Sequence, residues 1–221
     1  EDLVIANIPD GRVIAIKRET GEIVWDKMVA VTNEFGSRER FFTAPITADD
    51  KVIIANGAGD GKTRGWVAAL EARTGKELWR KSGEAFAGLQ HIIYGSYSQE
   101  KFVVVGSRNV GTGKTGKLWF DVHVFDAKTG DKIWSKSQDQ HFGVNGEHGE
   151  QDRHPTIVGD TLFCEPYAYD LATGTPREWK WPWVNSQRRG CGTLSASASG
   201  LFFRSDTART FDLTEGKTNP I

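Results

Sequence analysis

The segment from Gln140 to His154 is rich in groups that bind metal ions. It holds three of the five histidines and three carboxylates: His141, His148, His154, Glu147, Glu150 and Asp152. Imidazole together with carboxylate suits zinc or another transition metal, so one hypothesis is a metal site and, more remotely, a metal-dependent hydrolase. The histidine spacings of seven and six residues match no ligand pattern with a defined geometry. The alternative is a solvated insertion in which His154 starts the next strand.

Two basic, glycine-rich triplets invite comparison with a phosphate-binding loop: Gly61-Lys62-Thr63 and Gly113-Lys114-Thr115. The first glycine of such a loop would fall at Asn56 or at Arg108, and strand-like sequence follows both triplets where the motif needs a helix. The pattern therefore excludes a phosphate loop. The stretch from Arg108 to Lys117 is either a site for an anionic ligand or a flexible connection between strands.

The two cysteines, Cys164 and Cys191, leave two interpretations open. They form one disulfide, which suits an oxidising compartment, or they remain separate buried thiols. No Cys-x-x-Cys pair exists in the sequence, which excludes a zinc site built on thiolates.

Charge and hydropathy exclude two classes of partner. The chain has 28 Lys and Arg against 29 Asp and Glu, so it lacks the basic excess that binding to nucleic acid needs. No apolar run approaches the roughly 20 residues of a membrane-spanning helix, and no signal peptide stands at Glu1. The 221 residues are 38% hydrophobic and include 25 Gly and 8 Trp, a composition that favours a folded β-rich chain with many turns.

One motif recurs along the chain and would position the histidines, carboxylates, basic triplets and cysteines described above. Each copy has an apolar strand, a turn that ends in glycine and, in the first four copies, a tryptophan four or five residues later. The motif glycines are separated by 54, 55, 44 and 42 residues and are Gly21, Gly75, Gly130, Gly174 and Gly216. These periods are typical of a four-stranded propeller blade with loop insertions.

Each copy predicts a β-hairpin. Apolar residues such as Val13 and Ala15 alternate along one strand, glycine supplies the turn, and the next strand carries the tryptophan. A second pair of short strands precedes the hairpin, within residues 43–55, 154–164 and 194–204. A sheet of four such strands cannot cover both of its own faces, so the units must stack radially as a propeller.

The regular spacing of the tryptophans predicts that they pack between blades and do not form a platform for a substrate. An indole buries on the order of 200 Å² and its N–H needs a backbone carbonyl. The residues concerned are Trp25, Trp79, Trp134 and Trp179.

In terms of strands, the chain is expected to be an arc of about 4–5 blades, short of the six to eight of a closed ring. The expected blades are residues 1–35, 36–90, 91–140, 141–190 and 191–221. Leu3 to Asn7 is expected to be the second strand of its blade, and Arg209 to Leu213 the third strand of a last blade that lacks its fourth. Such an arc needs further blades or another chain to close.

The repeated pattern Ala/Phe-x-Asp/Glu-x-x-Thr-Gly-x-x-x-Trp resembles the tryptophan-docking motif of pyrroloquinoline quinone (PQQ) repeat propellers, the quinoprotein alcohol dehydrogenase-like superfamily. The resemblance covers nearly the whole chain. It implies an all-β propeller from the periplasm or cell envelope of a bacterium. The same fold carries dehydrogenases and also non-catalytic assembly and binding proteins, so the resemblance alone does not decide the function.

The segment from Asn56 to Trp66 resembles the glycine-rich loop of the dehydrogenases, which implies that Asp60 is a calcium ligand beside PQQ. That position is usually Glu in the family, and an ordinary Asp-Gly turn is the alternative. Adjacent cysteines and assignable loops for a second calcium ligand and a catalytic base are missing. We therefore expect a binding or scaffolding module, with a fragment of a PQQ- and calcium-dependent alcohol dehydrogenase as the alternative. A protein or small-molecule ligand is expected at the axial end lined by the loops around Asp60, Arg64, Arg108 and Arg188.

Overall fold

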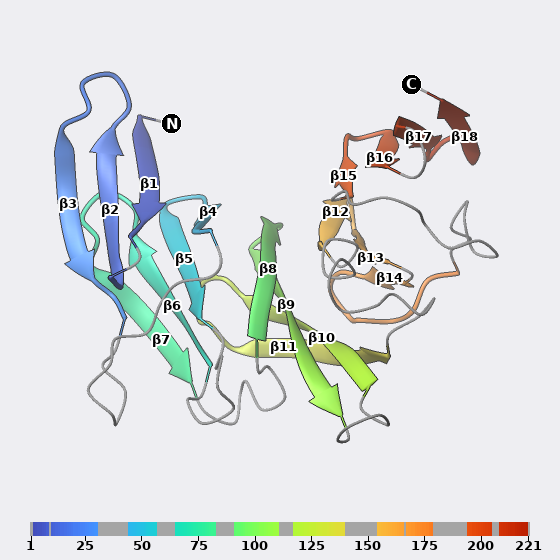
Figure 1. Ribbon diagram of the computed structural model, residues 1–221, viewed down its shortest axis with the longest axis horizontal. Helices are drawn as coiled ribbons and strands as arrows, with labels where there is room; N and C mark the ends of the chain where they lie inside the picture. The colour runs from blue at the N-terminus through green and yellow to red at the C-terminus, as the bar shows by residue number, and fades with distance from the viewer. Residues whose placement is uncertain are drawn as a thin grey trace.

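Every regular element that the computed structural model describes is a β-strand. The described residues are 2–8, 10–30, 44–56, 65–82, 91–110, 117–139, 154–165, 167–178, 194–204 and 208–220. Their strands form five antiparallel sheets, which follow one another from the N-terminus to the C-terminus (Figure 1). Among these residues no helix has the length and apolar character needed to cross a membrane.

Each sheet is built from strands that are consecutive in the chain. The first contains β1 (Leu3–Asn7), β2 (Arg12–Lys17) and β3 (Ile23–Met28). The second contains β4 (Ile46–Ala48), β5 (Lys51–Asn56), β6 (Trp66–Glu71) and β7 (Glu77–Ser82). The third contains β8 (His91–Ser98), β9 (Lys101–Val110), β10 (Lys117–Asp126) and β11 (Lys132–Asp139). The fourth contains β12 (Thr156–Val158), β13 (Thr161–Cys164) and β14 (Tyr167–Asp170), and the fifth β15 (Ser195–Ala196), β16 (Gly200–Arg204), β17 (Ala208–Asp212) and β18 (Lys217–Pro220).

The sheets are propeller blades arranged as an arc. Strand β4 contacts β8, β8 contacts β12, and β12 contacts β15, so the first strands of these blades lie next to one another along the axis. The tryptophan-bearing strands lie at the opposite edge of their sheets. In Figure 1 the first and fifth sheets stand at the two ends of the arc, and no strand pairing joins them within the described ranges. The expected fold, an incomplete propeller of antiparallel blades, is confirmed.

The last blade differs from the expectation. The sequence predicts that it lacks a fourth strand, because no tryptophan follows Gly216. Strand β18 nevertheless pairs with β17, from Asp212 opposite Lys217 to Arg209 opposite Pro220. That prediction is therefore wrong: the ladder of a strand is made by backbone groups and does not need the tryptophan side chain.

The turn that carries the motif glycine has the same geometry in all five blades. The glycine N–H donates to the carbonyl four residues earlier, and φ of the glycine lies between +66° and +74°. In the fourth blade the Asp170 carboxylate also accepts the N–H groups of Ala172 and Thr173, at 3.0 and 2.9 Å. Only glycine takes this φ at little cost, which explains why it recurs in every copy.

Three tryptophans lock one blade to the next, as the sequence predicts. Each indole N–H donates to a carbonyl in the following blade: Trp25 to Ala72 at 2.9 Å, Trp79 to Ala127 at 3.2 Å and Trp134 to Leu171 at 2.9 Å. Each indole also lies directly over the next motif glycine, where a Cβ atom would come within 2.6–2.7 Å of the ring at Gly75, Gly130 and Gly174. We call each of these contacts a tryptophan lock. Trp179 lies outside the described residues.

The cores lie between the blades. Alternating side chains of each inner pair of strands point to opposite neighbours, so Ile54 packs against Val13 of the first blade whereas Ile53 packs against Phe102 of the third. A sheet with apolar side chains on both faces is stable only between two others, which the arc provides.

Candidate functional site at the loop end

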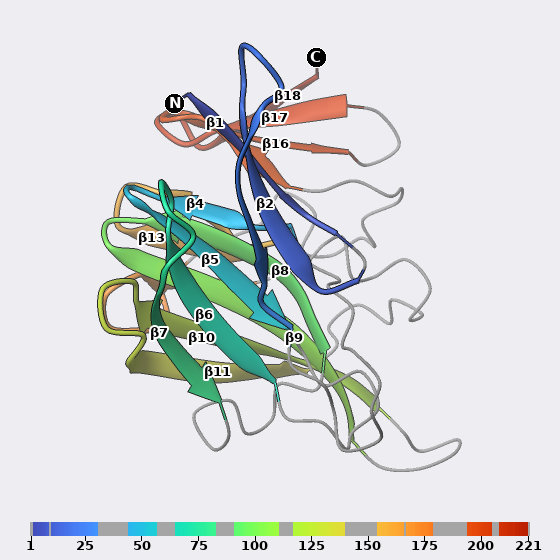
Figure 2. The same cartoon turned by 90° about the vertical axis from the view of Figure 1, so that its left-hand side faces the viewer.

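The two ends of the blades differ. Tight turns join β4 to β5, β8 to β9 and β12 to β13, and the motif turns lie at this same end, which we call the turn end. The longer connections, residues 57–65, 83–90, 111–116 and 140–155, join strand ends at the opposite end, which we call the loop end. Figure 2 views the blades from the side, with the turn from β10 to β11 projecting away from the loop end. Connections of variable length gathered on a rigid scaffold are typical of a binding surface.

Apart from Arg188, the residues singled out in the sequence belong to these connections or to strand ends at the loop end. Five of them lie outside the described residues: Asp60, Arg64, His141, His148 and Arg188. Arg108 lies in β9, where its backbone pairs with Trp119 of β10. Whether their side chains meet at the axis remains a prediction.

His154 is the one candidate metal ligand whose surroundings are described. It precedes β12 at the inner edge of the fourth blade, and its ring packs against Tyr94 of β8 with centroids 4.9 Å apart. Its Nδ1 is buried and has no hydrogen-bond partner among the described residues. Burial lowers the pKa of His154, so the imidazole is neutral at pH 7 and can accept a hydrogen bond or bind a metal.

Ser96 lies two residues beyond Tyr94 on the same face of β8, and its Oγ is also buried without a partner in the described part of the chain. The seam between the third and fourth blades thus contains, close to the axis, an imidazole nitrogen and a hydroxyl that no other described residue engages. Such groups can hold a polar ligand or a water molecule.

A second polar pair lies between the second and third blades. Asp121 and His123 occupy the same face of β10 as Phe125, and they are 3% and 4% exposed. Ser137 donates to Asp121 Oδ1 at 2.6 Å, while His123 stacks on Phe125 with centroids 6.0 Å apart and its Nδ1 has no partner among the described residues. Burial, helped by the charge of Lys132, lowers the pKa of His123 to about 4. This histidine is therefore held neutral inside the protein.

We predict that His123 makes the fold sensitive to mild acid. The pKa of His123 is about 4 in the fold and about 6.5 in the unfolded chain, so the unfolded chain binds more protons between these values. The contribution of neutral His123 to the free energy of unfolding is fully present above about pH 6.5 and decreases as the pH drops toward 4. The loss from His123 between pH 7 and pH 5 is about 2 kcal/mol. It is measured by chemical denaturation at several pH values.

The control is His123→Asn, which removes the titrating group and should flatten this part of the pH profile. His154, whose pKa is also lowered by burial, adds to the loss of stability at mildly acidic pH. Asp170 does not contribute in this range: Arg177 lowers its pKa to about 2, so its stabilising effect is lost only below about pH 4. An unchanged slope between pH 7 and 5 in His123→Asn contradicts the prediction.

The described residues contain no group of three or more His, Cys, Asp or Glu side chains arranged to hold a metal ion. His154 accordingly belongs to no such group within those ranges. Asp121 already accepts a hydrogen bond from Ser137. Cys164 is buried at the end of β13, and Cys191 lies outside the described residues, so both interpretations of the cysteines stay open.

The sequence reasoning did not identify Asp121, His123, Tyr94 or Ser96. A signal for the first two was present, because they stand at alternate positions with Phe125 in a strand whose apolar residues predict a buried face. A polar residue at such a position indicates either a hydrogen-bonded core group or a site.

Comparison with known proteins identifies the family of this chain and two kinds of related protein. The family model described as outer membrane protein assembly factor BamB matches residues 63–212. The quinone-dependent alcohol dehydrogenase subunit of Gluconacetobacter polyoxogenes is 39% identical over 74 residues, which is 32% of this chain and 10% of that protein. The outer membrane protein assembly factor BamB of Legionella pneumophila is 27% identical over 115 residues, 52% of this chain and 29% of that protein.

Among solved structures, BamB from Moraxella catarrhalis superimposes with a TM-score of 0.56 and 20% identity. The match covers 98% of this chain and 59% of that protein. The chain therefore shares its fold with a solved propeller while spanning only part of the length of each of these relatives.

Proposed function

Since the chain belongs to the PQQ-repeat family described as outer membrane protein assembly factor BamB, we propose that it is a binding or scaffolding module of the bacterial cell envelope. It holds a partner at the loop end of its blades. A protein or a small molecule is the proposed ligand, and Arg64, Arg108 and Arg188 are its proposed basic contacts, with Asp60 beside them.

The observation that carries this proposal is the difference between the two ends. The turn end is closed by the same tight turn five times over, with the carbonyl and glycine groups of three turns already engaged by the tryptophan locks. The loop end has the long connections and, just before the first strand of the fourth blade, the Nδ1 of His154, which has no partner among the described residues. A group available for recognition thus lies where the connections vary from blade to blade.

The second candidate function is that of a quinone-dependent alcohol dehydrogenase, favoured by the 39% identity over 74 residues with such an enzyme. It would use PQQ with calcium, and Asp60 would be the calcium ligand. Calcium takes six to eight oxygen ligands, and the described residues contain no group of three or more His, Cys, Asp or Glu side chains arranged to hold a metal ion.

Reconstitution with PQQ and calcium distinguishes the two functions. We expect the purified protein to give no stoichiometric quinone absorbance and no dye-linked oxidation of alcohols, because the sequence offers Asp60 as a calcium ligand without assignable loops for a second ligand and a catalytic base. Asp60→Ala should then behave as the unmodified protein does. The matched control is Asp50→Ala, which removes an aspartate of the turn end that pairs with Lys51. Stoichiometric binding with turnover, lost in Asp60→Ala and kept in Asp50→Ala, overturns the scaffolding function.

A further inference from the structure

A buried histidine lies on each side of the third blade, which stands in the middle of the arc (Figure 1). His123 stacks on Phe125 in the core between the second and third blades, which we call the second seam. His154 packs against Tyr94 between the third and fourth blades, the third seam. The Nδ1 atoms of both rings are buried without a partner among the described residues. A protonated ring in either seam would therefore have a buried donor without an acceptor, which is costly.

The charged groups that face His123 oppose its protonation on balance. Its own strand contributes Asp121, β11 contributes Lys132, and from the second blade Lys81 points into the same seam. Burial and the charge of Lys132 outweigh the attraction of Asp121 and lower the pKa of His123 to about 4. The other strands of this seam, β5, β6 and β9, contribute apolar side chains to its core: Ile53, Ala55, Val67, Ala69, Phe102 and Val104.

The surroundings of His154 act in the same direction. Burial lowers the pKa of this ring, and a backbone hydrogen bond with Pro155 only partly opposes the effect. From the third blade its described neighbours are Tyr94 and, two residues further along the same face of β8, the hydroxyl of Ser96. Both seams of the third blade are thus packed around a neutral imidazole.

The ion pair that crosses the second seam does not respond to the same mild acid. Lys81 Nζ lies 2.8 Å from Asp131 Oδ1. Hydrogen bonds from Lys81 and Thr129 lower the pKa of Asp131, so this carboxylate remains ionised at pH 5. The contact therefore persists when His123 is protonated, and it tethers the second and third blades to each other.

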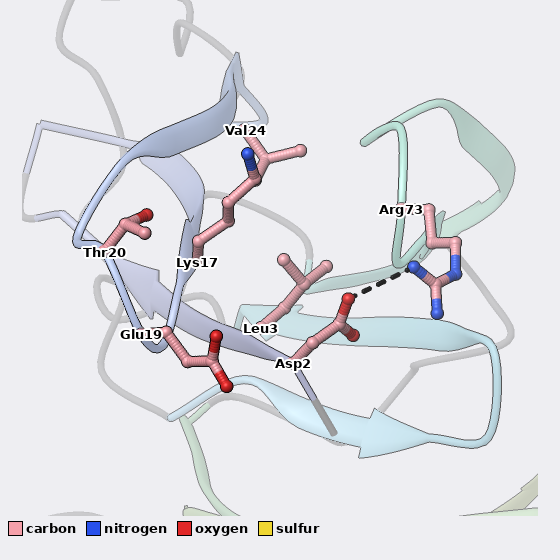
Figure 3. Close-up of a pocket in the computed structure, with 7 residues that line it drawn as sticks. All are labelled: Asp2, Leu3, Lys17, Glu19, Thr20, Val24 and Arg73. Atoms are coloured by element: carbon pink, nitrogen blue, oxygen red, sulfur yellow. Dashed lines mark hydrogen bonds and ion pairs between the residues drawn. The ribbon is translucent and has the colours of Figure 1, made fainter.

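The first seam, between the first and second blades, provides an internal reference. No residue before His91 is a histidine. This seam is joined by the Trp25 lock and by Arg80, which donates to the Val29 carbonyl at 3.1 Å. Figure 3 shows its exposed ion pair, in which Arg73 Nη1 lies 3.3 Å from Asp2 Oδ2. A backbone hydrogen bond and Arg73 lower the pKa of Asp2, so this pair also persists at pH 5.

We propose that the third blade is an acid-sensitive blade: protonation of His123 on one side and of His154 on the other loosens its packing against both neighbours. The inference rests on the proposed function, because it assigns a form of regulation to binding at the loop end. The three arginines proposed as contacts come from different parts of the arc, Arg64 following β5, Arg108 in β9 and Arg188 following β14. Loosening the third blade changes their spacing, and a partner that contacts all three is bound more weakly in mild acid.

Hydrogen exchange of the indole N–H groups tests the proposal on the whole chain, because each tryptophan lock reports on its own seam. Trp25 reports on the first seam, Trp79 on the second and Trp134 on the third. Protection is expressed relative to free tryptophan at the same pH, which removes the pH dependence of the exchange chemistry itself.

We expect the protection of Trp79 to fall about 20-fold between pH 7 and pH 5. This ratio follows from a pKa of His123 of about 4 in the closed seam and about 6.5 in the open one. The protection of Trp134 should fall by a smaller factor, because His154 is less completely buried than His123. The protection of Trp25 should stay constant.

Two matched variants assign the effect to the histidines. His123→Asn should abolish the fall at Trp79 and keep the fall at Trp134, and His154→Asn should do the reverse. Constant protection of Trp79 or of Trp134 in the unmodified protein overturns the proposal, as does a response of Trp79 that persists in His123→Asn. An equal fall at Trp25 also overturns it, because the acid would then unfold the whole protein. The proposed function fails by a different result, PQQ binding with turnover, which does not depend on the seams.

Discussion

Replacing the partly buried Trp79 by alanine lowers the free energy of unfolding by about 3–5 kcal/mol, the usual cost of removing a large aromatic side chain from a packed contact. The indole is central to the contact between the second and third blades. Its N–H donates to Ala127, its ring stacks on Phe102 at 5.7 Å, and its face covers Gly130. Truncation leaves a cavity over Gly130 and an unpaired carbonyl at Ala127. Chemical denaturation of the purified variant measures the loss.

Leu78→Ala is the matched control for this variant. Leu78 precedes Trp79 in β7 but is 44% exposed, so its truncation should change stability by no more than about 0.5 kcal/mol. Trp79→Phe keeps an aromatic ring over Gly130 and removes only the N–H donor, so it should fall between the two. If Trp79→Ala were as mild as Leu78→Ala, the tryptophan would not be locking the blades.

The second large effect is expected from a single added methyl group at Gly75. A Cβ there would lie 2.7 Å from Cδ2 of the Trp25 indole and 2.9 Å from Cγ of Lys27. Alanine also takes the φ of +68° at a cost of about 1–2 kcal/mol. Overpacking against the ring adds about 1–3 kcal/mol, so Gly75→Ala should be destabilised by both terms together.

Gly21→Ala isolates the first of these two terms. Gly21 has nearly the same φ, +72°, but no atom lies within 4 Å of an added Cβ. Its variant should therefore lose only the conformational term, about 1–2 kcal/mol. The difference between the two variants, measured by the same denaturation assay, reports the steric cost of displacing Trp25. Equal losses would show that the indole is not held over Gly75.

The sequence is sufficient to predict the blades because the motif turn of each blade requires a glycine with a positive φ. A glycine is needed wherever φ is near +70°, and the tryptophan follows at a fixed distance from it, so Gly21, Gly75 and Gly130 mark their blades without reference to any structure. Strand β18 could not be predicted in this way. It is held by backbone pairing with β17, and no side chain in Lys217–Pro220 is required by that pairing.

The candidate site is harder to predict, for a related reason. The family resemblance points to Asp60, and Arg188 is expected in a loop at the axial end, yet no local pattern contains the way connections of separate blades meet. His123 is the opposite case. Its burial depends on the neighbouring blade, so the same residue in an isolated strand would be an ordinary exposed histidine with a pKa near 6.5.

The tryptophan locks also determine how the protein unfolds. Each lock connects a blade only to its immediate neighbour, so the arc is a linear chain of coupled units, in which total stability is close to a sum of unit and nearest-neighbour terms. Weakening the Trp79 lock divides the chain into a two-blade segment and the remainder. Loss of structure would then stop at that boundary and not spread through the whole protein. A propeller of this kind unfolds one blade at a time, and the weakest tryptophan lock determines the boundary at which it divides.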